Sequence, residues 1–311
     1  MIDKSIFKLD DRQKGAWVTI GNFDGLHLGH QALIQALIKL AKNDGKPAGL
    51  ITFWPHPKVA LGQVSGPFYL CTRSEKQVLF KQFDLDFVYC FGFDNAFSTL
   101  SAEDFLRALH KNLFINGLVT GANFSVGRAR EGTLQNLQSI FDELKIHVEI
   151  IEPILVDGEM VSSGHIRHLL TMGQVSDAKR MLGRNYSVQG KVIQGKGVGS
   201  KFGFPTANIA YQPEKFLPKT GVYATWAYLG GKRHPAVSNV GLRPTFEYVK
   251  TPKVETLLLD FEGNIYGELL KVAFVALLRD EVKFDGVQPL LAQIEQDKVL
   301  ARRILENDQD A

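Results

Sequence analysis

Residues 16–30 read AWVTIGNFDGLHLGH and give the clearest indication of the fold. They begin with a short apolar run that includes β-branched residues, pass through a glycine-rich turn, and enter a segment whose apolar residues recur at helical spacing. A strand that turns through glycines into a helix is typical of the opening unit of an α/β domain. We therefore predict a buried strand over residues 16–20 with a helix directly after it.

The same alternation of strand and helix continues along the first half of the chain. Further apolar runs predict strands at residues 48–53, 86–91, 117–120 and 148–151. Apolar residues at helical spacing predict helices at residues 73–83, 102–114 and 133–144. Because strands that alternate with helices form βαβ units, we expect a Rossmann-like parallel sheet with helices on both faces.

The pattern changes near residue 183. Short runs bounded by glycine and proline predict strands at residues 186–194, 221–229, 236–241, 254–261 and 269–277. With no helical period between them, these strands indicate an antiparallel barrel or sandwich. One amphipathic helix follows, and its apolar face is formed by Leu290, Leu291, Ile294, Ala301 and Ile304. We expect two domains, residues 1–183 and 184–311.

Composition excludes several classes of protein. The 311 residues are 45% hydrophobic and 22% charged, which suits folded domains and excludes wholesale disorder. The net charge of +3 comes without a lysine-rich stripe carrying aromatics, so nucleic-acid binding is not expected. Cys71 and Cys90 are too few for a disulfide scaffold or a cysteine zinc site. We see no secretion signal or membrane-length apolar run and expect a cytoplasmic protein.

Two histidines open the first predicted helix. A helix start presents unpaired N–H groups and a partial positive charge, and nearby glycines let the backbone approach a phosphate closely. His27 and His30 lie three positions apart, so both can face a bound group and stabilise charge on a departing pyrophosphate. We favour this reading over a plain capped helix with solvent-facing histidines. A two-histidine zinc site is a further alternative, but no third ligand is evident nearby.

A second helix start lies in VSSGHIR at residues 161–167. Ser162 or Ser163 can cap this helix, and the same end can hold phosphate with the hydroxyl groups and Arg167 as donors. An ordinary capped helix with a solvated arginine is the plain alternative. Ligands of parallel sheets gather at the carboxyl ends of the strands, so the two helix starts could face one phosphate chain.

The second domain opens with a loop dense in glycine and lysine, residues 190–201, which runs into FGFPTAN at residues 202–208. Backbone N–H groups of such a loop can surround phosphate, although a flexible basic hairpin is an equal alternative. Thr206 and Asn208 carry the oxygen atoms that Mg²⁺ prefers when it also binds phosphate. The residue order of a Walker A motif is absent.

The first domain resembles a known superfamily. GNFDGLHLGH with the later SSGHIR is similar to the HxGH nucleotidyltransferases, which attack the α-phosphate of a nucleoside triphosphate and release pyrophosphate. Residues 121–128 (GANFSVGR) and 53–57 (FWPHP) resemble segments of the bacterial FAD synthetase module. The resemblance implies that His27 and His30 act in adenylyl transfer. Asn123 and Phe124 are then expected to contact flavin, and Trp54 is another aromatic that could stack on a ring.

The second domain resembles riboflavin kinases. GKVIQGKGVGSKFGFPTAN at residues 190–208 is followed in the family's order by GVYA at 221–224, NVGLRPTF at 239–246 and VET at 254–256. The resemblance implies a six-stranded barrel with a terminal helix and Mg²⁺ held with ATP by Thr206 and Asn208. It makes Glu255 the catalytic base of the kinase and places Arg243 and Thr245 beside the flavin.

The motifs and resemblances together assign a set of residues to ATP and phosphate. These are Gly21, Phe23, Asp24, Gly25, Gly29, Ser162, Ser163, Arg167, Gly195, Lys196, Gly197, Gly199 and Lys201. Four positions depart from the families' patterns. Gly164 stands where threonine is usual, Ala122 where an acidic residue is frequent, Val126 where an aromatic is frequent, and Leu257 where histidine is frequent.

The resemblance covers residues 15 to 297 and implies the bifunctional riboflavin kinase/FMN adenylyltransferase family. The barrel would make FMN from riboflavin and ATP, and the α/β domain would adenylylate FMN to FAD. Flavins would then be substrates and products rather than redox cofactors, and no nucleic acid, membrane or obligate protein partner is expected. Two alternatives remain: another phosphorylated acceptor such as nicotinamide mononucleotide, or a flavin-sensing protein whose catalysis has decayed.

Overall fold

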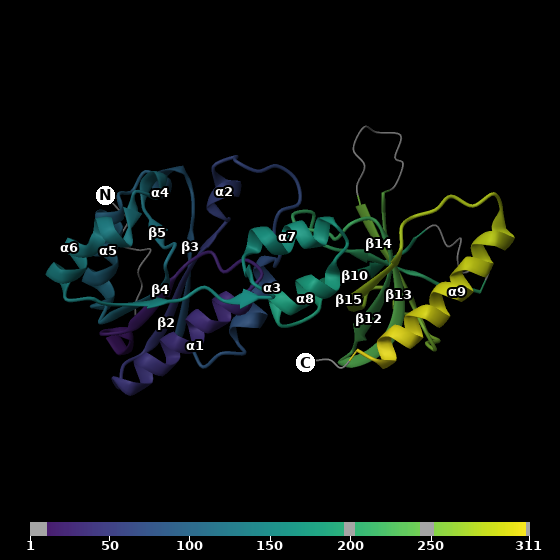
Figure 1. The fold of residues 1–311 in the computed structure, drawn as a ribbon, viewed down its shortest axis with the longest axis horizontal. Coiled ribbons are helices and arrows are strands. Elements are labelled where there is room, and N and C mark those ends of the chain that lie inside the picture. The colour runs from purple at the N-terminus through teal and green to yellow at the C-terminus, as the bar shows by residue number, and fades with distance from the viewer. Residues whose placement is uncertain (1–10, 196–202, 243–251, 309–311) are drawn as a thin grey trace. The chain divides into compact units, whose positions relative to one another are not determined.

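The computed structural model of the chain describes residues 11–195, 203–242 and 252–308. The chain divides into two compact units, residues 1–161 and 162–311, and each unit has its own hydrophobic core (Figure 1). The residues between 162 and the expected domain boundary at 183/184 therefore pack within the second unit.

A five-stranded parallel sheet in the order β3-β2-β1-β4-β7 forms the centre of the first unit. Its strands are β1 (Trp17–Ile20), β2 (Ala48–Trp54), β3 (Phe87–Gly92), β4 (Gly117–Gly121) and β7 (His147–Ile151). β1 is buried along its whole length, as expected of a central strand covered on both faces. All five predicted strands are present, and the predicted parallel sheet is confirmed.

Six α-helices accompany this sheet in the described residues of the first unit. They are α1 (Leu28–Asn43), α2 (Pro57–Ala60), α3 (Arg73–Phe80), α4 (Asn95–Ser98), α5 (Ala102–Leu113) and α6 (Leu134–Leu144). α3 begins at a capping box made by Thr72 and Glu75 and ends three residues before the predicted position. The one-turn helices α2 and α4 were not predicted, because four residues are too short to show a helical period.

Short elements complete the first unit. They are the hairpin of β5 (Ser125–Val126) with β6 (Gly132–Thr133), the hairpin of β8 (Leu155–Val156) with β9 (Glu159–Met160), and the 3₁₀ turns η2 (Asp11–Gln13) and η3 (Arg128–Arg130).

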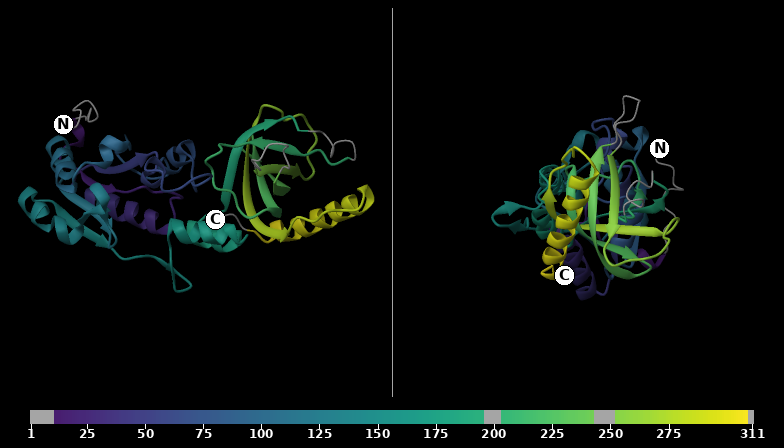
Figure 2. Two further views of the ribbon diagram at one scale, coloured as in Figure 1. Left: turned by 90° about the horizontal axis from the view of Figure 1, so that it is seen from above. Right: turned by 90° about the vertical axis from the view of Figure 1, so that its right-hand side faces the viewer.

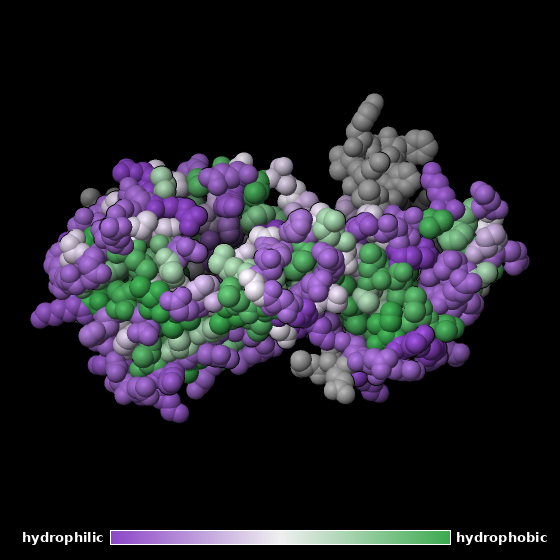
Figure 3. Space-filling model, viewed as in Figure 1, coloured by the Kyte–Doolittle hydropathy of each residue, from purple (hydrophilic) through white to green (hydrophobic). Residues whose placement is uncertain are grey.

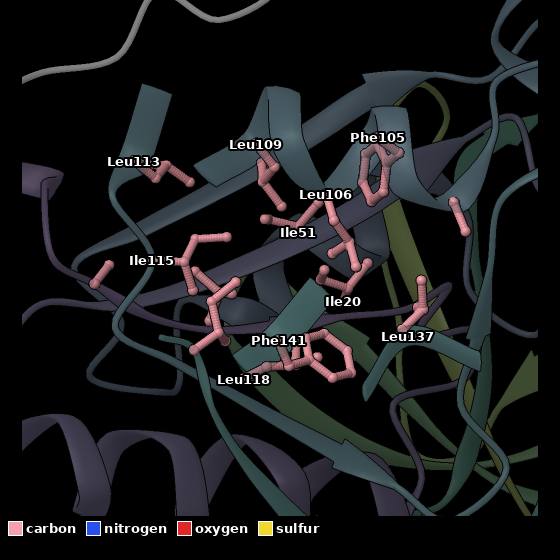
Figure 4. Packing of buried hydrophobic residues seen from close by; sticks show 14 of the residues in the cluster. Ile20, Ile51, Phe105, Leu106, Leu109, Leu113, Ile115, Leu118, Leu137 and Phe141 are labelled. Atoms are coloured by element: carbon pink, nitrogen blue, oxygen red, sulfur yellow. The ribbon is translucent and has the colours of Figure 1, made fainter. Parts of the chain in front are cut away.

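Alternate side chains of the strands pack on opposite faces of the sheet. Ile20, Ile51 and Leu118 belong to the cluster that α5 and α6 cover, which Figure 4 shows from close by. Trp17 and Val119 pack instead with α1 residues. Helices therefore cover both faces, as predicted from the βαβ pattern.

The strand order reverses direction between β1 and β4. β1 is followed by α1 and then β2 on one side, whereas β4 pairs with the other side of β1. In an open parallel sheet, ligands bind outside the carboxyl ends of the strands at such a reversal. The turns that begin at Gly21 and Gly121 leave the sheet at this place.

The second unit contains a closed antiparallel barrel in the order β10-β11-β14-β13-β12-β15. Its strands are β10 (Tyr186–Ile193), β11 (Ala207–Ala210), β12 (Gly221–Leu229), β13 (Lys232–Leu242), β14 (Pro252–Leu258) and β15 (Leu269–Arg279). Pairing of β10 with β15 closes the barrel and leaves no unpaired sheet edge. The predicted six-stranded barrel is confirmed.

The described residues of the second unit form three helices. They are α7 (Ser163–Thr171), α8 (Val175–Leu182) and α9 (Val287–Glu306). α9 is the predicted terminal helix and lies alongside the barrel (Figure 2). Hydrophobic residues gather where α9 meets the strands, as Figure 3 shows.

The β12–β13 hairpin is longer than predicted because its turn takes only two residues. Leu229 pairs with Lys232, and the intervening Gly230 and Gly231 have φ values of +56° and +80°. Two positive φ values in a two-residue turn match the right-handed twist of the strands, and glycine adopts them readily.

Three buried hydroxyl groups form a chain of hydrogen bonds in the barrel interior, which we call the hydroxyl ladder. Thr225 Oγ1 lies 2.8 Å from Ser238 Oγ, which lies 2.9 Å from Thr256 Oγ1. Thr225 also donates to the carbonyl oxygen of Ala236 at 3.2 Å. These side chains come from β12, β13 and β14, so the ladder joins three neighbouring strands.

The contact between Gly49 and Phe87 gives a test of the sheet. The Phe87 ring covers Gly49 on the neighbouring strand, and a Cβ there would lie 2.0 Å from the ring. Gly49→Ala is expected to lower the free energy of unfolding by about 1–3 kcal/mol, because the ring must leave its place in the core. Chemical denaturation measures the change. Gly92→Ala is the matched control, since a Cβ there meets no described atom within 4 Å, and equal effects of the two variants would contradict this packing.

Candidate active sites

The turn after β1 has an uncommon backbone conformation. Phe23 and Leu26 have φ values of +48° and +41°, in the left-handed region that residues other than glycine seldom adopt. The Phe23 ring lies against Gly21, where a Cβ would come within 3.2 Å of it. Gly25 also has a positive φ, of +84°, which glycine tolerates. Backbone strain of this kind persists only where surrounding contacts hold it, and it is concentrated at functional sites.

His27 and His30 lie together at the start of α1. His27 is the N-cap, and its Nδ1 accepts the backbone N–H of His30 at 3.4 Å. The two rings stack with centroids 3.6 Å apart and an angle of 18° between their planes. Gly29 lies beside them, and a Cβ there would come within 3.3 Å of the His27 ring. The pair therefore sits where the helix offers positive charge to an anion.

Asp24 joins this turn to a distant segment of the chain. Its buried carboxylate accepts the backbone N–H groups of Leu70 at 3.2 Å and Cys71 at 3.1 Å. These residues directly precede the N-cap of α3. These contacts hold the turn in place, and the assignment of Asp24 to phosphate from the sequence stays a prediction.

The turn after β4 carries Asn123 and Phe124. The backbone N–H of Phe124 donates to the carbonyl oxygen of Gly121 at 3.1 Å, which closes the turn. Asn123 is exposed, whereas Phe124 is partly buried against the core under α5. Trp54, at the end of β2, stacks on Tyr69 with centroids 4.3 Å apart. Asn123 is thus presented to solvent at the sheet edge where β1 also ends.

The start of α7 is capped by Ser162, as predicted. Ser162 Oγ accepts the backbone N–H of His165 at 3.1 Å, and Arg167 donates to the carbonyl oxygen of Ser163 at 3.1 Å. Gly164 is exposed, and the nearest atom to a Cβ there would be Ser162 Oγ at 3.9 Å. Because that is ordinary van der Waals distance, this helix start has room for the side chain that the families usually carry.

Strand register in the second unit brings three polar side chains into one row. Asn208 on β11 pairs with Glu255 on β14, which pairs in turn with Asn239 on β13. Residues directly opposite each other in a sheet point to the same face. The Oδ1 atoms of Asn208 and Asn239 are buried and accept no hydrogen bond from a described residue. Buried acceptors are costly to leave unpaired, so both atoms are candidates to bind a ligand.

An apolar cavity of about 340 Å³ adjoins this row. Its polar lining includes Thr206, Asn239, Glu255 and Glu281. Its apolar walls come from the barrel and from α9 and include Val222, Val237, Leu257, Leu290, Leu291 and Ile294. Leu257 thus shares the cavity with Glu255, as their spacing along the strand predicts. A largely apolar cavity with a few polar groups suits a flat heteroaromatic ligand.

Sequence reasoning missed the residues of α9 and of the β15–α9 connection that line this cavity. Arg279 donates to both carboxylate oxygens of the buried Asp297, at 2.8 to 3.1 Å, and so ties β15 to α9. Glu281 accepts a long hydrogen bond from Asn239 at 3.4 Å. Two sequence features could have indicated that this connection and α9 together line a cavity. They are the motif LRDEV at residues 278–282 and the apolar face of α9.

A second hollow, of about 260 Å³, is lined by Asn208, Gly195 and Lys253 among others. A Cβ at Gly195 would lie 2.3 Å from Asn208 Nδ2, so glycine is required for this approach. Several predicted site residues lie outside the described part of the chain. They are Lys196, Gly197, Gly199, Lys201, Arg243 and Thr245.

The described residues offer no group of three or more histidine, cysteine, aspartate or glutamate side chains that could hold a metal ion. The alternative of a zinc site at His27 and His30 therefore gains no third ligand from that part of the chain.

Two family models match the chain. Residues 9–165 match the model described as FAD synthetase, and residues 182–305 match the one described as riboflavin kinase.

Curated relatives match along almost the whole length. Bifunctional riboflavin kinase/FMN adenylyltransferases of Listeria monocytogenes, Bacillus subtilis and Escherichia coli are each 33% identical to the chain. The alignments cover 90%, 96% and 93% of this chain and 90%, 95% and 93% of the respective relatives.

One similar solved structure is described as a macrolide-efflux protein from Streptococcus pneumoniae. It is 29% identical, with a TM-score of 0.85, and the match covers 93% of this chain and 94% of that one. In the described residues of this chain, no helix has both the length and the hydropathy needed to cross a bilayer.

Proposed function

The chain belongs to the family of bifunctional riboflavin kinases/FMN adenylyltransferases, and on this premise we propose which residues carry each reaction. It is an enzyme of FAD biosynthesis: it phosphorylates riboflavin to FMN and adenylylates FMN to FAD. We place the boundary between the two catalytic modules at 183/184, where α8 ends at Gly183 and the barrel begins. Its substrates are then small molecules, and it acts in the cytoplasm without nucleic acid or membrane.

Adenylyl transfer is assigned to the turn after β1 and the start of α1. The positive end of α1 and the glycine-rich backbone at Gly21, Gly25 and Gly29 attract the phosphate chain of ATP. His27 and His30 donate hydrogen bonds to phosphate oxygens, and they stabilise the negative charge that grows on pyrophosphate as FMN attacks the α-phosphate. Their fixed stacking keeps this geometry in place before ATP arrives.

Two further groups are assigned to the adenylylation substrates. Ser162, Ser163 and Arg167 at the start of α7 bind phosphate, since the FAD synthetase match extends to residue 165 and includes both serines. Asn123 and Phe124 contact the flavin, because they emerge beside the topological reversal between β1 and β4.

The kinase reaction is assigned to the row of Asn208, Glu255 and Asn239. The observation that carries this proposal is the strand register, which joins Glu255 and Asn239, both lining the apolar cavity, to Asn208, which lines the Gly195 hollow. Riboflavin fits the apolar cavity, and the ATP phosphates fit the glycine-lined hollow. Glu255 then takes the proton from the ribityl 5′-hydroxyl as that oxygen attacks the γ-phosphate.

The residues present fit a magnesium ion bound with ATP. Asn208 Oδ1 is a buried acceptor without a described hydrogen-bond donor, and Thr206, two residues earlier and just before β11, contributes a hydroxyl oxygen. We propose that these two residues hold Mg²⁺. When bound, the ion neutralises negative charge on the ATP phosphates.

Glu255→Gln is expected to lower the rate of FMN formation from riboflavin roughly 10²–10⁴-fold, because a general base is lost while the side-chain shape is kept. Formation of FAD from supplied FMN should not change. Chromatographic separation of the flavin products measures both. Glu262→Gln, an exposed glutamate after β14, is the matched control. Full kinase activity in the Glu255 variant would refute its role as base.

Replacing both His27 and His30 by alanine should produce the opposite result. FAD formation from FMN is expected to fall roughly 10²-fold or more, because donors to the developing charge are removed. FMN formation from riboflavin should continue at the normal rate. Release of pyrophosphate is the direct readout. Unchanged pyrophosphate release would mean that adenylyl transfer takes place elsewhere.

Gly164→Thr is expected to lower the KM for ATP in adenylylation about fivefold, which corresponds to one added hydrogen bond to phosphate. The position has room for the side chain. Gly164→Ala adds the same Cβ without the hydroxyl and should leave this KM unchanged. Steady-state kinetics with saturating FMN compares the three proteins. An equal decrease in both variants would assign the gain to helix stabilisation instead.

A further inference from the structure

Lys76 is a buried lysine on α3 to which no role in either reaction has been assigned. Only 6% of its surface is exposed. Its Nζ donates to the backbone carbonyl oxygen of Asn22 at 2.6 Å, in the strained turn after β1. Thr52 Oγ1, from β2, donates to the same carbonyl oxygen at 3.3 Å. Two side chains from different elements therefore fix one peptide group of the turn that leads to His27.

Keeping a cation at this place is unfavourable for folding. Burial lowers the pKa of Lys76, and the charges of Asp24, Cys71 and Cys90, which act in the opposite direction, do not outweigh it. The ammonium also lies 5.8 Å from the centre of the Trp54 ring, a contact that offsets part of the lost hydration. An apolar side chain of similar length would avoid this desolvation cost. Stability alone therefore does not account for a lysine here.

The region around α3 contacts the same turn at two other points. The backbone N–H groups of Leu70 and Cys71 donate to Asp24, as described above. Phe80, at the end of α3, packs edge-on against the Phe23 ring with centroids 6.1 Å apart, and Phe23 packs in turn against His30. The left-handed backbone of Phe23 is thus enclosed by contacts from this segment, and Lys76 adds a charged hydrogen-bond donor.

We propose that Lys76 is a positioning residue for adenylyl transfer: its buried ammonium holds the Asn22 carbonyl and so keeps the turn in the shape that places His27 and His30. This inference rests on the assignment of adenylyl transfer to that turn. Because the flavin is assigned to Asn123 and Phe124, the loss of Lys76 should affect kcat rather than the KM for FMN. A displacement of about 1 Å at a catalytic group can lower a rate about 10²-fold.

The test compares Lys76→Met with Lys81→Met in the full-length enzyme. Methionine keeps the length of the side chain and removes the charge and the donor, and Lys81 is an exposed lysine next to the same helix. For Lys76→Met we expect kcat for FAD formation from FMN to fall about 10²-fold with little change in the KM for FMN. FMN formation from riboflavin should be unchanged, and calorimetry should show a melting temperature no lower than that of the wild type. Lys81→Met should match the wild type throughout.

Thr52→Val tests whether Lys76 acts through its hydrogen bond to the Asn22 carbonyl oxygen. It removes the second donor without changing the side-chain shape, so kcat for FAD formation should fall in the same direction but less, about fivefold. A charged donor contributes more than a neutral one, which sets the order of the two effects.

The possible failures are distinguishable. Normal adenylylation in Lys76→Met, together with its loss when His27 and His30 are replaced by alanine, would overturn the role of Lys76 alone. Normal adenylylation in the histidine variant would overturn the assignment of the turn and, with it, this inference. A lowered melting temperature in Lys76→Met, together with a lower kcat and a higher KM for FMN, would make Lys76 a structural residue and also reject the proposal.

Discussion

Hydrogen-bonded register between neighbouring strands determines which side chains can act together in each unit. In the parallel sheet, β1 runs beside β4 with Trp17 opposite Gly117, so the turns that follow the two strands open at one edge. In the barrel, the register of β11, β14 and β13 sets Asn208, Glu255 and Asn239 in a row. Neither group is close in sequence, and both depend on strand pairing that the hydrophobic cores hold in place.

The turn after β1 shows how a stable scaffold supports an unfavourable local conformation. Positive φ values at Phe23 and Leu26 cost free energy, as does the burial of a lysine. The surrounding sheet and helices bury most of the apolar strand residues. The free energy gained from this burial offsets the cost of the strained turn. The result is a turn with one defined shape, which is what charge stabilisation in a transition state requires.

The sequence was sufficient for much of the architecture, because long apolar periods and glycine-rich motifs are local features. It did not reveal β11, whose sequence ANIA has a single β-branched residue, or α8, whose N-cap Gln174 makes no side-chain capping bond. The contacts of Asp24 could not be predicted from the motif. The motif shows which residues form the glycine-rich turn, but the partners of the Asp24 carboxylate are 46 and 47 positions away. The contribution of α9 to the apolar cavity is likewise a long-range contact.

The hydroxyl ladder inside the barrel has a consequence for the cavity outside it. The hydroxyl groups of Thr225, Ser238 and Thr256 are hydrogen-bonded in series, and either oxygen of each pair can be the donor. These bonds fit one alignment of β14 against β13. A slip of one residue would turn Thr256 outward and carry Glu255 into the apolar interior. Three neutral hydroxyl groups thus favour the one strand alignment in which the Glu255 carboxylate faces the apolar cavity.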